Sequence, residues 1–230
     1  MKKIKYLPTR KKKAVIRWSI VIALVLLALF ISPFHFLPSQ SLRYFEDDRM
    51  TGRTKIIDRQ FAVPLKIPGV QLATLSENEN AVVYCIHTYN LITGWYPHAG
   101  TEADCSEAGK AVYASRLFAS SSPTESSGAV FIGRIMDDAI DRVEIVADFA
   151  KYAWLHPDAT PENRVIASQD GFARKDGPET FCLSVHFGED FPRNEEGQRC
   201  SFESVIRCYD AAGALLYCEE SKDGWAASLG

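Results

Sequence analysis

Two cysteine–histidine pairs are the residues of this chain whose types and spacing are best suited to chemistry. Cys85 and His87 lie two residues apart in a segment that alternates like a β-strand, so their side chains share one face. Cys182 and His186 share a face of a second alternating segment. A thiolate beside an imidazole could ligate a metal ion or act as a nucleophile with its base. The alternative, which we favour for both pairs, is a half-cystine beside a histidine that faces solvent.

Other candidate residues lie in segments expected to be loops or turns. His98 is near Asp104 and Cys105 in sequence, so it could be a metal ligand or a base. Asp137 and Asp138 could begin a cation site, although a hairpin turn also favours polar residues there. Four aromatic residues could form a patch that binds a sugar or a peptide, or could instead pack in the core. These are Trp95, Tyr96, Tyr152 and Trp154.

The motifs of common hydrolases and nucleotide-binding enzymes are absent from the sequence. There is no G-x-S-x-G, S-x-x-K, H-E-x-x-H or P-loop motif, and no pair of aspartates two residues apart. The sequence also lacks an Asn-x-Ser/Thr sequon, which favours a bacterial source. We therefore assign no catalytic residue, no cofactor and no metal site from the sequence.

All six cysteines follow residue 37, and they are Cys85, Cys105, Cys182, Cys200, Cys208 and Cys218. In an oxidising compartment an even number predicts up to three disulfides, for which about 15 connectivities exist. Buried free thiols are the alternative. No two cysteines have the C-x-x-C spacing of a zinc ribbon or a thioredoxin motif.

The predicted C-terminal hairpin restrains the pairing of Cys208 and Cys218. With residues 211–213 as a three-residue loop, Cys208 pairs with Leu216, and Cys218 lies diagonally at a Cα separation of about 7–8 Å. A disulfide requires about 4.4–6.8 Å. We therefore expect these two cysteines not to bond each other. Their candidate partners are Cys182 and Cys200, which leaves Cys85 with Cys105.

The elements that must position these residues are short β-strands. Alternation of apolar and polar residues predicts strands over 71–75, 81–89, 129–136, 140–147, 164–168, 181–187, 202–209 and 214–218. Residues 129–136 and 140–147 are predicted to pair as a hairpin, and 110–119 fits a strand slightly better than a helix. Residues 94–107 and 120–128 read as loops. The predicted fold class is all-β, mainly an antiparallel sandwich or barrel, with an immunoglobulin-like sandwich as one form, preceded by one transmembrane helix.

Residues 18–37 (WSIVIALVLLALFISPFHFL) contain no formal charge. As a helix rising about 1.5 Å per residue, a segment of this length spans the roughly 30 Å hydrocarbon core of a bilayer. No small-x-small cleavage site follows it, which favours an uncleaved signal-anchor helix over a signal peptide. The lipid bilayer is therefore the predicted partner of this segment.

The charges on the two sides of this segment are opposite. Residues 1–17 carry eight basic residues and no acid, so the positive-inside rule places them in the cytoplasm. The rest of the chain contains 18 basic residues and all 29 acidic ones, which gives a net charge of −11 after the segment. Such an acidic domain is unsuited to nucleic acid, so no nucleic-acid partner is expected.

These features divide the chain into four parts. Residues 1–17 form a basic cytoplasmic tail, 18–37 a transmembrane signal-anchor, 38–54 a membrane-proximal stalk with a short helix near 42–48, and 55–230 an extracytoplasmic β-rich domain. The part after the segment has about 190 residues, enough for one domain with its own core. The predicted localisation is the cell membrane, with the N-terminus in the cytoplasm.

The function expected from the sequence is that of a binding, accessory or regulatory module at the bacterial cell envelope. Its partner would be an envelope protein or the cell wall. The alternative is an envelope hydrolase with a Cys/His or metal site around His87, His98 or His186. A transmembrane regulator is a third possibility, limited by a cytoplasmic tail too short to fold alone.

Overall fold

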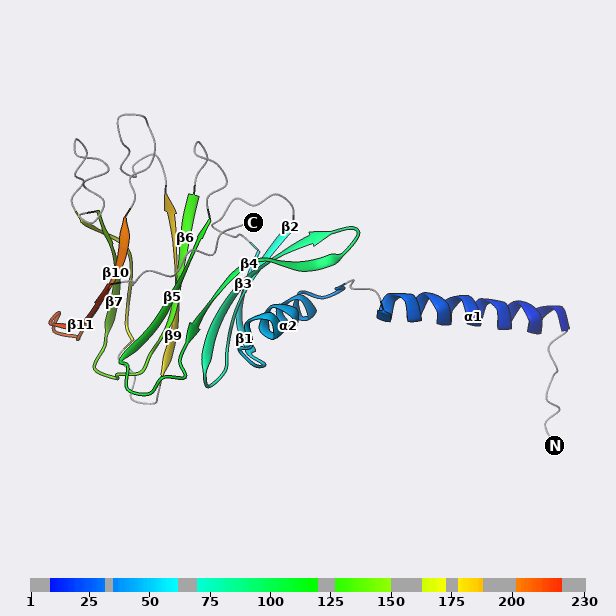
Figure 1. Ribbon diagram of the computed structural model, residues 1–230, viewed down its shortest axis with the longest axis horizontal. Helices are drawn as coiled ribbons and strands as arrows, with labels where there is room; N and C mark the ends of the chain where they lie inside the picture. Colours follow the sequence, from blue (N-terminus) through cyan, green and yellow to red (C-terminus); the bar gives the residue numbers. More distant parts are fainter. Residues whose placement is uncertain are drawn as a thin grey trace, which may run out of the picture.

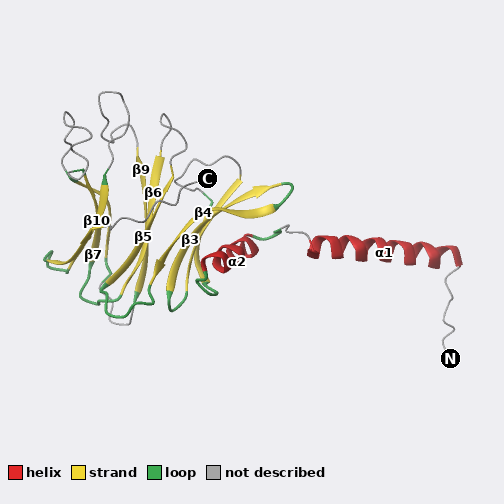
Figure 2. Ribbon diagram, viewed as in Figure 1, coloured by secondary structure: helices red, strands yellow, loops and turns green. Residues whose placement is uncertain are grey.

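The computed structural model describes residues 9–31, 35–61, 70–119, 127–149, 163–172, 178–187 and 202–220. These residues form two helices and three antiparallel sheets (Figures 1 and 2). The helices are α1 (Thr9–Ile31) and α2 (Pro38–Arg49). The first sheet has the order β1 (Lys55–Gln60), β2 (Val70–Glu77), β3 (Ala81–Asn90), β4 (Gly94–Asp104). The middle sheet has the order β5 (Val112–Ala119), β6 (Ser127–Ile135), β9 (Glu179–Phe187). The third sheet has the order β11 (Leu215–Glu220), β10 (Glu203–Tyr209), β7 (Arg142–Asp148), β8 (Arg164–Asp170).

The three sheets stack face to face, with α2 on the outer face of the first sheet (Figure 1). One core lies between the first and middle sheets and includes Tyr84, Ile86 and Ile132. A second core lies between the middle and third sheets and includes Phe131 and Phe181. The all-β antiparallel prediction is confirmed. The number of stacked sheets is three, whereas an immunoglobulin-like sandwich has two.

Strand β6 is the central strand of the middle sheet because its sequence is apolar on both faces. Ala129 and Phe131 point to the core shared with the third sheet, and Val130 and Ile132 point to the core shared with the first. The predicted hairpin between 129–136 and 140–147 is wrong, since β6 pairs with β5 and β9 while β7 pairs with β8 and β10. The short turn between β6 and β7 carries the chain into the next layer.

The structure also corrects the prediction for residues 94–107, which were expected to be a loop but contain strand β4. Residues 94–104 of this segment pair with β3, and only 105–107 are a loop as expected. Pro97 has no backbone N–H to donate, but it lies opposite His87, where the register between the two strands shifts. The other predicted strands are present, and 110–119 contains β5.

Helix α2 belongs to the folded domain, although its segment was expected to be a stalk. Leu42 and Phe45 are buried against β3. The buried Glu46 carboxylate accepts hydrogen bonds from the Thr54 backbone N–H at 2.9 Å and from the Arg53 guanidinium at 3.2 Å. These contacts fix α2 to the sheet from both its apolar and its polar side.

Helix α1 begins within the basic tail and continues through most of the predicted signal-anchor. Among the helices in the described part of the chain, none combines the length and apolar character needed to cross a membrane. Side chains 25–34, half of the predicted anchor, lie outside the described residues.

The C-terminal hairpin forms as predicted, with one difference in register. Asp210 begins its turn, and Gly213 takes a positive φ of 82°. A bulge beside Tyr209 shifts the pairing, so that Cys208 lies opposite Tyr217 and not Leu216.

Candidate functional site

The Cys85–His87 pair lies under helix α2, where it is sealed from solvent. Both residues have no exposed surface. The His87 Nδ1 atom lies 2.9 Å from the Ser41 hydroxyl of α2, and Nε2 lies 2.9 Å from the Thr74 hydroxyl of β2. The Cys85 Sγ atom lies 3.8 Å from His87 Nδ1.

Burial holds both members of this pair in their neutral forms. Desolvation lowers the pKa of His87 to about 4 and raises the pKa of the Cys85 thiol far above its usual range. A nucleophilic cysteine needs the thiolate and access to a substrate, and Cys85 has neither. The pair therefore joins α2 to the sheet and does not form a Cys–His dyad.

The second pair, Cys182 and His186, is divided between two environments. Cys182 packs partly against the core between the first and middle sheets, and burial raises the pKa of its thiol to about 12. His186 is exposed and lies opposite Gly128, whereas Cys182 lies opposite Ile132. Within the described residues, no three His, Cys, Asp or Glu side chains gather in a way that could hold a metal ion.

The other candidate residues lie on β4 or in the β6–β7 turn, or outside the described residues. The exposed His98 ring lies 6.3 Å from that of Tyr96 on β4. Asp137 accepts a hydrogen bond from the Ala139 backbone N–H at 2.9 Å, which is the role of a turn residue. Trp95 packs edge-on against Tyr89 across β3 and β4. Tyr152 and Trp154 lie outside the described residues.

The five described cysteines are free thiols, and Cys200 lies outside the described residues. The suggested Cys85–Cys105 pair is wrong. Cys85 lies opposite Gly100 and faces α2, while Cys105 follows the end of β4 and packs on the opposite face of the sheet. Cys208 and Cys218 do not bond each other, as expected, but the reason is the bulge, which places Cys218 opposite Arg207.

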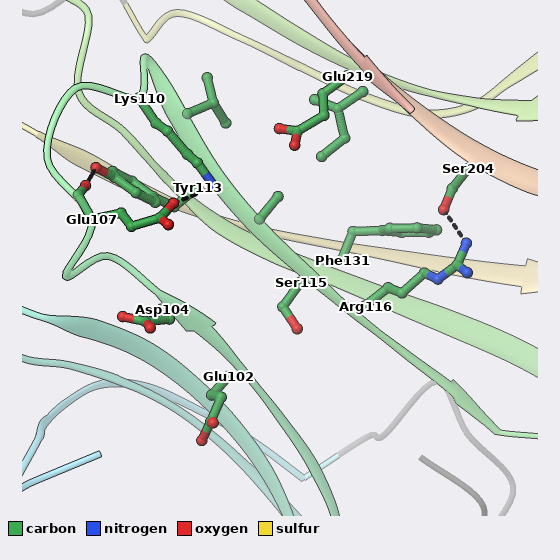
Figure 3. A pocket seen from close by; sticks show the side chains of 13 residues that line it. Glu102, Asp104, Glu107, Lys110, Tyr113, Ser115, Arg116, Phe131, Ser204 and Glu219 are labelled. Atoms are coloured by element: carbon green, nitrogen blue, oxygen red, sulfur yellow. Dashed lines mark hydrogen bonds and ion pairs between the residues drawn. The ribbon is translucent and has the colours of Figure 1, made fainter. Parts of the chain in front are cut away.

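A groove that sequence reasoning missed lies where the three sheets meet at one side of the stack (Figure 3). Its volume is about 480 Å³, within the usual size range of ligand pockets. It is lined by Glu102, Asp104, Glu107, Lys110, Val112, Tyr113, Ala114, Ser115, Arg116, Phe131, Ser204, Ile206 and Glu219. These residues belong to β4, the β4–β5 loop, β5, β6, β10 and β11.

The groove runs along an open edge of β5. The lining includes every residue from Val112 to Arg116. Successive side chains of a strand point to opposite faces, so a groove lined by consecutive residues lies along the strand's edge. Among the residues that the structure describes, β5 is an edge strand of the middle sheet and pairs only with β6. Strand β4 of the first sheet and strands β10 and β11 of the third form its walls (Figure 3).

Side chains from both walls are fixed at the groove. Arg116 donates to the Ser204 hydroxyl at 2.5 Å, which ties β5 to β10. On the other face of β5, Ser115 is hydrogen-bonded to Thr101 of β4. At one end Lys110 lies 2.9 Å from the Glu107 carboxylate.

The lining includes four acidic and two basic residues. Glu102 and Asp104 lie opposite Val83 and Ala81, so their side chains point to the face of β4 that carries α2. Burial raises the pKa of Glu102, and Arg49 partly opposes that rise. One Glu102 carboxylate oxygen is buried and has no hydrogen-bond partner within the described part of the chain. Hydrogen bonds from Ser106 lower the pKa of Asp104. The carboxylates at the groove itself are those of Glu107, which pairs with Lys110, and of Glu219.

The lining residues were missed because they are far apart in sequence. Glu102, Asp104 and Glu107 fell in the segment expected to be a loop, and Ser204 and Glu219 come from the C-terminal hairpin. The three acidic residues within 102–107 were the only feature of the local sequence that marked this region as a possible site. No protein-family model, curated protein or solved structure matches this chain.

Proposed function

We propose that this chain is a binding module, held at the outer face of a bacterial cell membrane by residues 18–37, whose ligand enters the groove along β5. The observation that carries the binding role is the open strand edge, set between walls from the other two sheets. An open edge offers backbone N–H and C=O groups to which an extended peptide can add as a further strand.

The chemistry of the lining indicates the class of ligand. The lining combines the carboxylates of Glu107 and Glu219 with the apolar side chains of Phe131 and Ile206. Backbone pairing with β5 would give affinity, and the carboxylates and the apolar residues would select side chains. The ligand is therefore an extended segment of an envelope protein that carries basic and apolar side chains.

The membrane attachment is supported by the sequence. Residues 18–37 lack formal charge and follow eight basic residues, while the part that follows has a net charge of −11. Such a charge distribution orients a single span with its basic end in the cytoplasm. The carboxylates of the groove would then face the extracytoplasmic space.

Site-specific photo-crosslinking in native membranes tests the binding role. A photoreactive residue in place of Glu219, at the groove, should form a discrete covalent adduct with a partner. The same residue in place of the exposed Asp138, on the β6–β7 turn, is the matched control and should form none. Glu107→Gln should weaken the adduct from position 219, because the attraction for a basic side chain is reduced.

Two results would count against this proposal. One is equal crosslinking from positions 219 and 138, which would indicate contact by chance collision. The other is an adduct at position 219 whose yield is the same with and without the Glu107 carboxylate, which would remove the charge-based choice of ligand.

A further inference from the structure

The tip of the β3–β4 hairpin is unusually apolar for an exposed turn. Leu91 and Ile92 are 86% and 83% exposed. Behind them, Tyr89 and Trp95 form an edge-to-face pair with ring centroids 5.5 Å apart. Large aliphatic side chains at a turn cost solubility unless another phase or molecule covers them.

The hairpin also lacks formal charge in an otherwise acidic domain. Residues 86–101 contain no Asp, Glu, Lys or Arg, although the part of the chain after residue 37 carries all 29 acidic residues. An acidic surface is repelled by anionic headgroups, so a neutral apolar projection is the part of this domain best suited to approach a lipid surface.

A backbone contact ties the hairpin to the end of the predicted anchor. The His35 N–H donates to the Thr93 carbonyl at 2.9 Å, and the Trp95 N–H donates to the His35 carbonyl at 2.8 Å. The His35 ring nitrogen Nδ1 also lies 2.9 Å from the Trp95 carbonyl oxygen. The base of the hairpin is therefore fixed to a residue of the segment 18–37 itself.

The direction of this contact decides where the tip points. The bridge between His35 and Gly94 is parallel, so the chain runs in the same direction through these two residues. The residues before His35 are the predicted anchor, and those before Gly94 are the tip. Figure 1 shows the hairpin extending toward the side of the domain on which α1 lies.

We propose that the β3–β4 tip enters the headgroup region of the bilayer and forms a second membrane contact beside the anchor. This inference rests on the proposed anchoring by residues 18–37. Leu91 and Ile92 would lie among the acyl-chain ends nearest the surface, with Tyr89 and Trp95 at the level of the headgroups, where these two residue types are enriched. The second contact would fix the tilt of the domain, which a single helix leaves free.

Tryptophan quenching by lipid in vesicles tests this contact on the full chain. Leu91→Trp and Leu215→Trp each place an indole at an exposed leucine. Leu215 is the matched control, because it belongs to β11, in the layer farthest from α1 (Figure 1). The proteins are reconstituted in phosphatidylcholine vesicles with or without bromine at carbons 6 and 7 of an acyl chain. We expect Leu91→Trp to show a blue-shifted emission and a loss of fluorescence beyond that of the wild type, and Leu215→Trp to show neither.

Retention on the vesicles after alkaline carbonate extraction distinguishes the two proposals. A chain that is retained while the indole at position 91 is quenched no more than that at 215 would overturn the second contact and leave the anchor standing. A chain that is released would overturn both. The vesicles contain no other protein, so a tip that served a protein partner instead would give no quenching. Leu91 lies at an exposed turn and Leu215 at the exposed start of β11, and unchanged circular dichroism verifies the fold.

Discussion

The imidazole of His87 lies between hydroxyl groups of α2 and β2, each 2.9 Å from a ring nitrogen. Its hydrogen-bonding neighbours in the described part of the chain are neutral groups, namely the Ser41 and Thr74 hydroxyls and the Cys85 thiol. Burial therefore determines its protonation state.

His87 should make the domain sensitive to acid. The pKa of its imidazole is lowered from 6.5 to about 4 in the folded state, so below pH 6.5 the unfolded chain binds a proton that the folded chain does not. The free energy of unfolding should fall by about 3 kcal/mol as the pH decreases from 6.5 to 4. Urea unfolding at several pH values measures this slope.

Substitution identifies the residue responsible. Glutamine has no titrating group in this range. In His87→Gln the fall in unfolding free energy between pH 6.5 and 4 that is due to His87 should therefore vanish, even if the variant is less stable at neutral pH. His98→Gln, at an exposed position, is the control and should keep the slope. An unchanged slope in His87→Gln would show that another group causes the acid sensitivity.

Glu102 should have the opposite dependence on pH. Because burial raises its pKa, the folded state binds this proton more tightly than the unfolded state. Stability is then lost as the pH rises from the ordinary carboxyl pKa through the raised value. Glu102→Gln should become more stable than the wild type over that rise, by less than about 1 kcal/mol because the side chain is partly exposed. Unfolding curves for the two proteins that stay parallel at all pH values would contradict this.

At the scale of elements, the close approach of α2 to the first sheet depends on a glycine. A Cβ at Gly100 would lie 2.6 Å from Phe45 Cζ and 2.9 Å from the Tyr84 carbonyl oxygen. Glycine at this position of β4 therefore makes room for the Phe45 ring. The helix and the sheet could not approach as closely with any larger residue at that position.

Gly100→Ala should destabilise the domain by about 1–3 kcal/mol, the usual range for overpacking a core. Phe45→Leu removes the ring atoms that collide with the new methyl group. The double variant should therefore lose less stability than the two single variants together, which denaturant unfolding measures. Strictly additive losses would show that α2 does not rest on β4 in this way.

The strands could be predicted from sequence to the extent that they depend on local alternation. Phe181, Leu183, Val185 and Phe187 alternate along β9, and all four are buried in one core as expected. Pairing partners could not be predicted, because β6 and β7 are adjacent in sequence yet belong to different sheets.

Non-local contacts also explain the other differences between the predicted and the observed structure. Pro97 and Gly94 are typical of a loop, and only the partner strand β3 makes their segment a strand. The Cys85–His87 pair was found from its spacing, but its burial depends on α2, which the sequence indicated as a stalk. The groove is formed by residues from 102 to 219, so no local pattern could reveal it.

At the scale of the whole molecule, α2 and the three sheets lie in layers that succeed one another away from α1 (Figure 1). The apolar hairpin tip is on the side of α1 (Figure 1), and the groove is formed by strands of all three sheets. This arrangement suits a domain that rests on a bilayer and presents its groove to partners in the envelope. It requires that the domain and the basic tail lie on opposite sides of the membrane.

Labelling of engineered cysteines tests that requirement most directly. Asp138→Cys lies on the exposed β6–β7 turn, and Lys5→Cys lies in the basic tail. With a membrane-impermeant maleimide on intact spheroplasts, we predict labelling above the wild-type level at position 138 and, only after lysis, at position 5. Labelling of position 5 but not 138 before lysis would contradict the account, and so would recovery of the chain outside the membrane fraction.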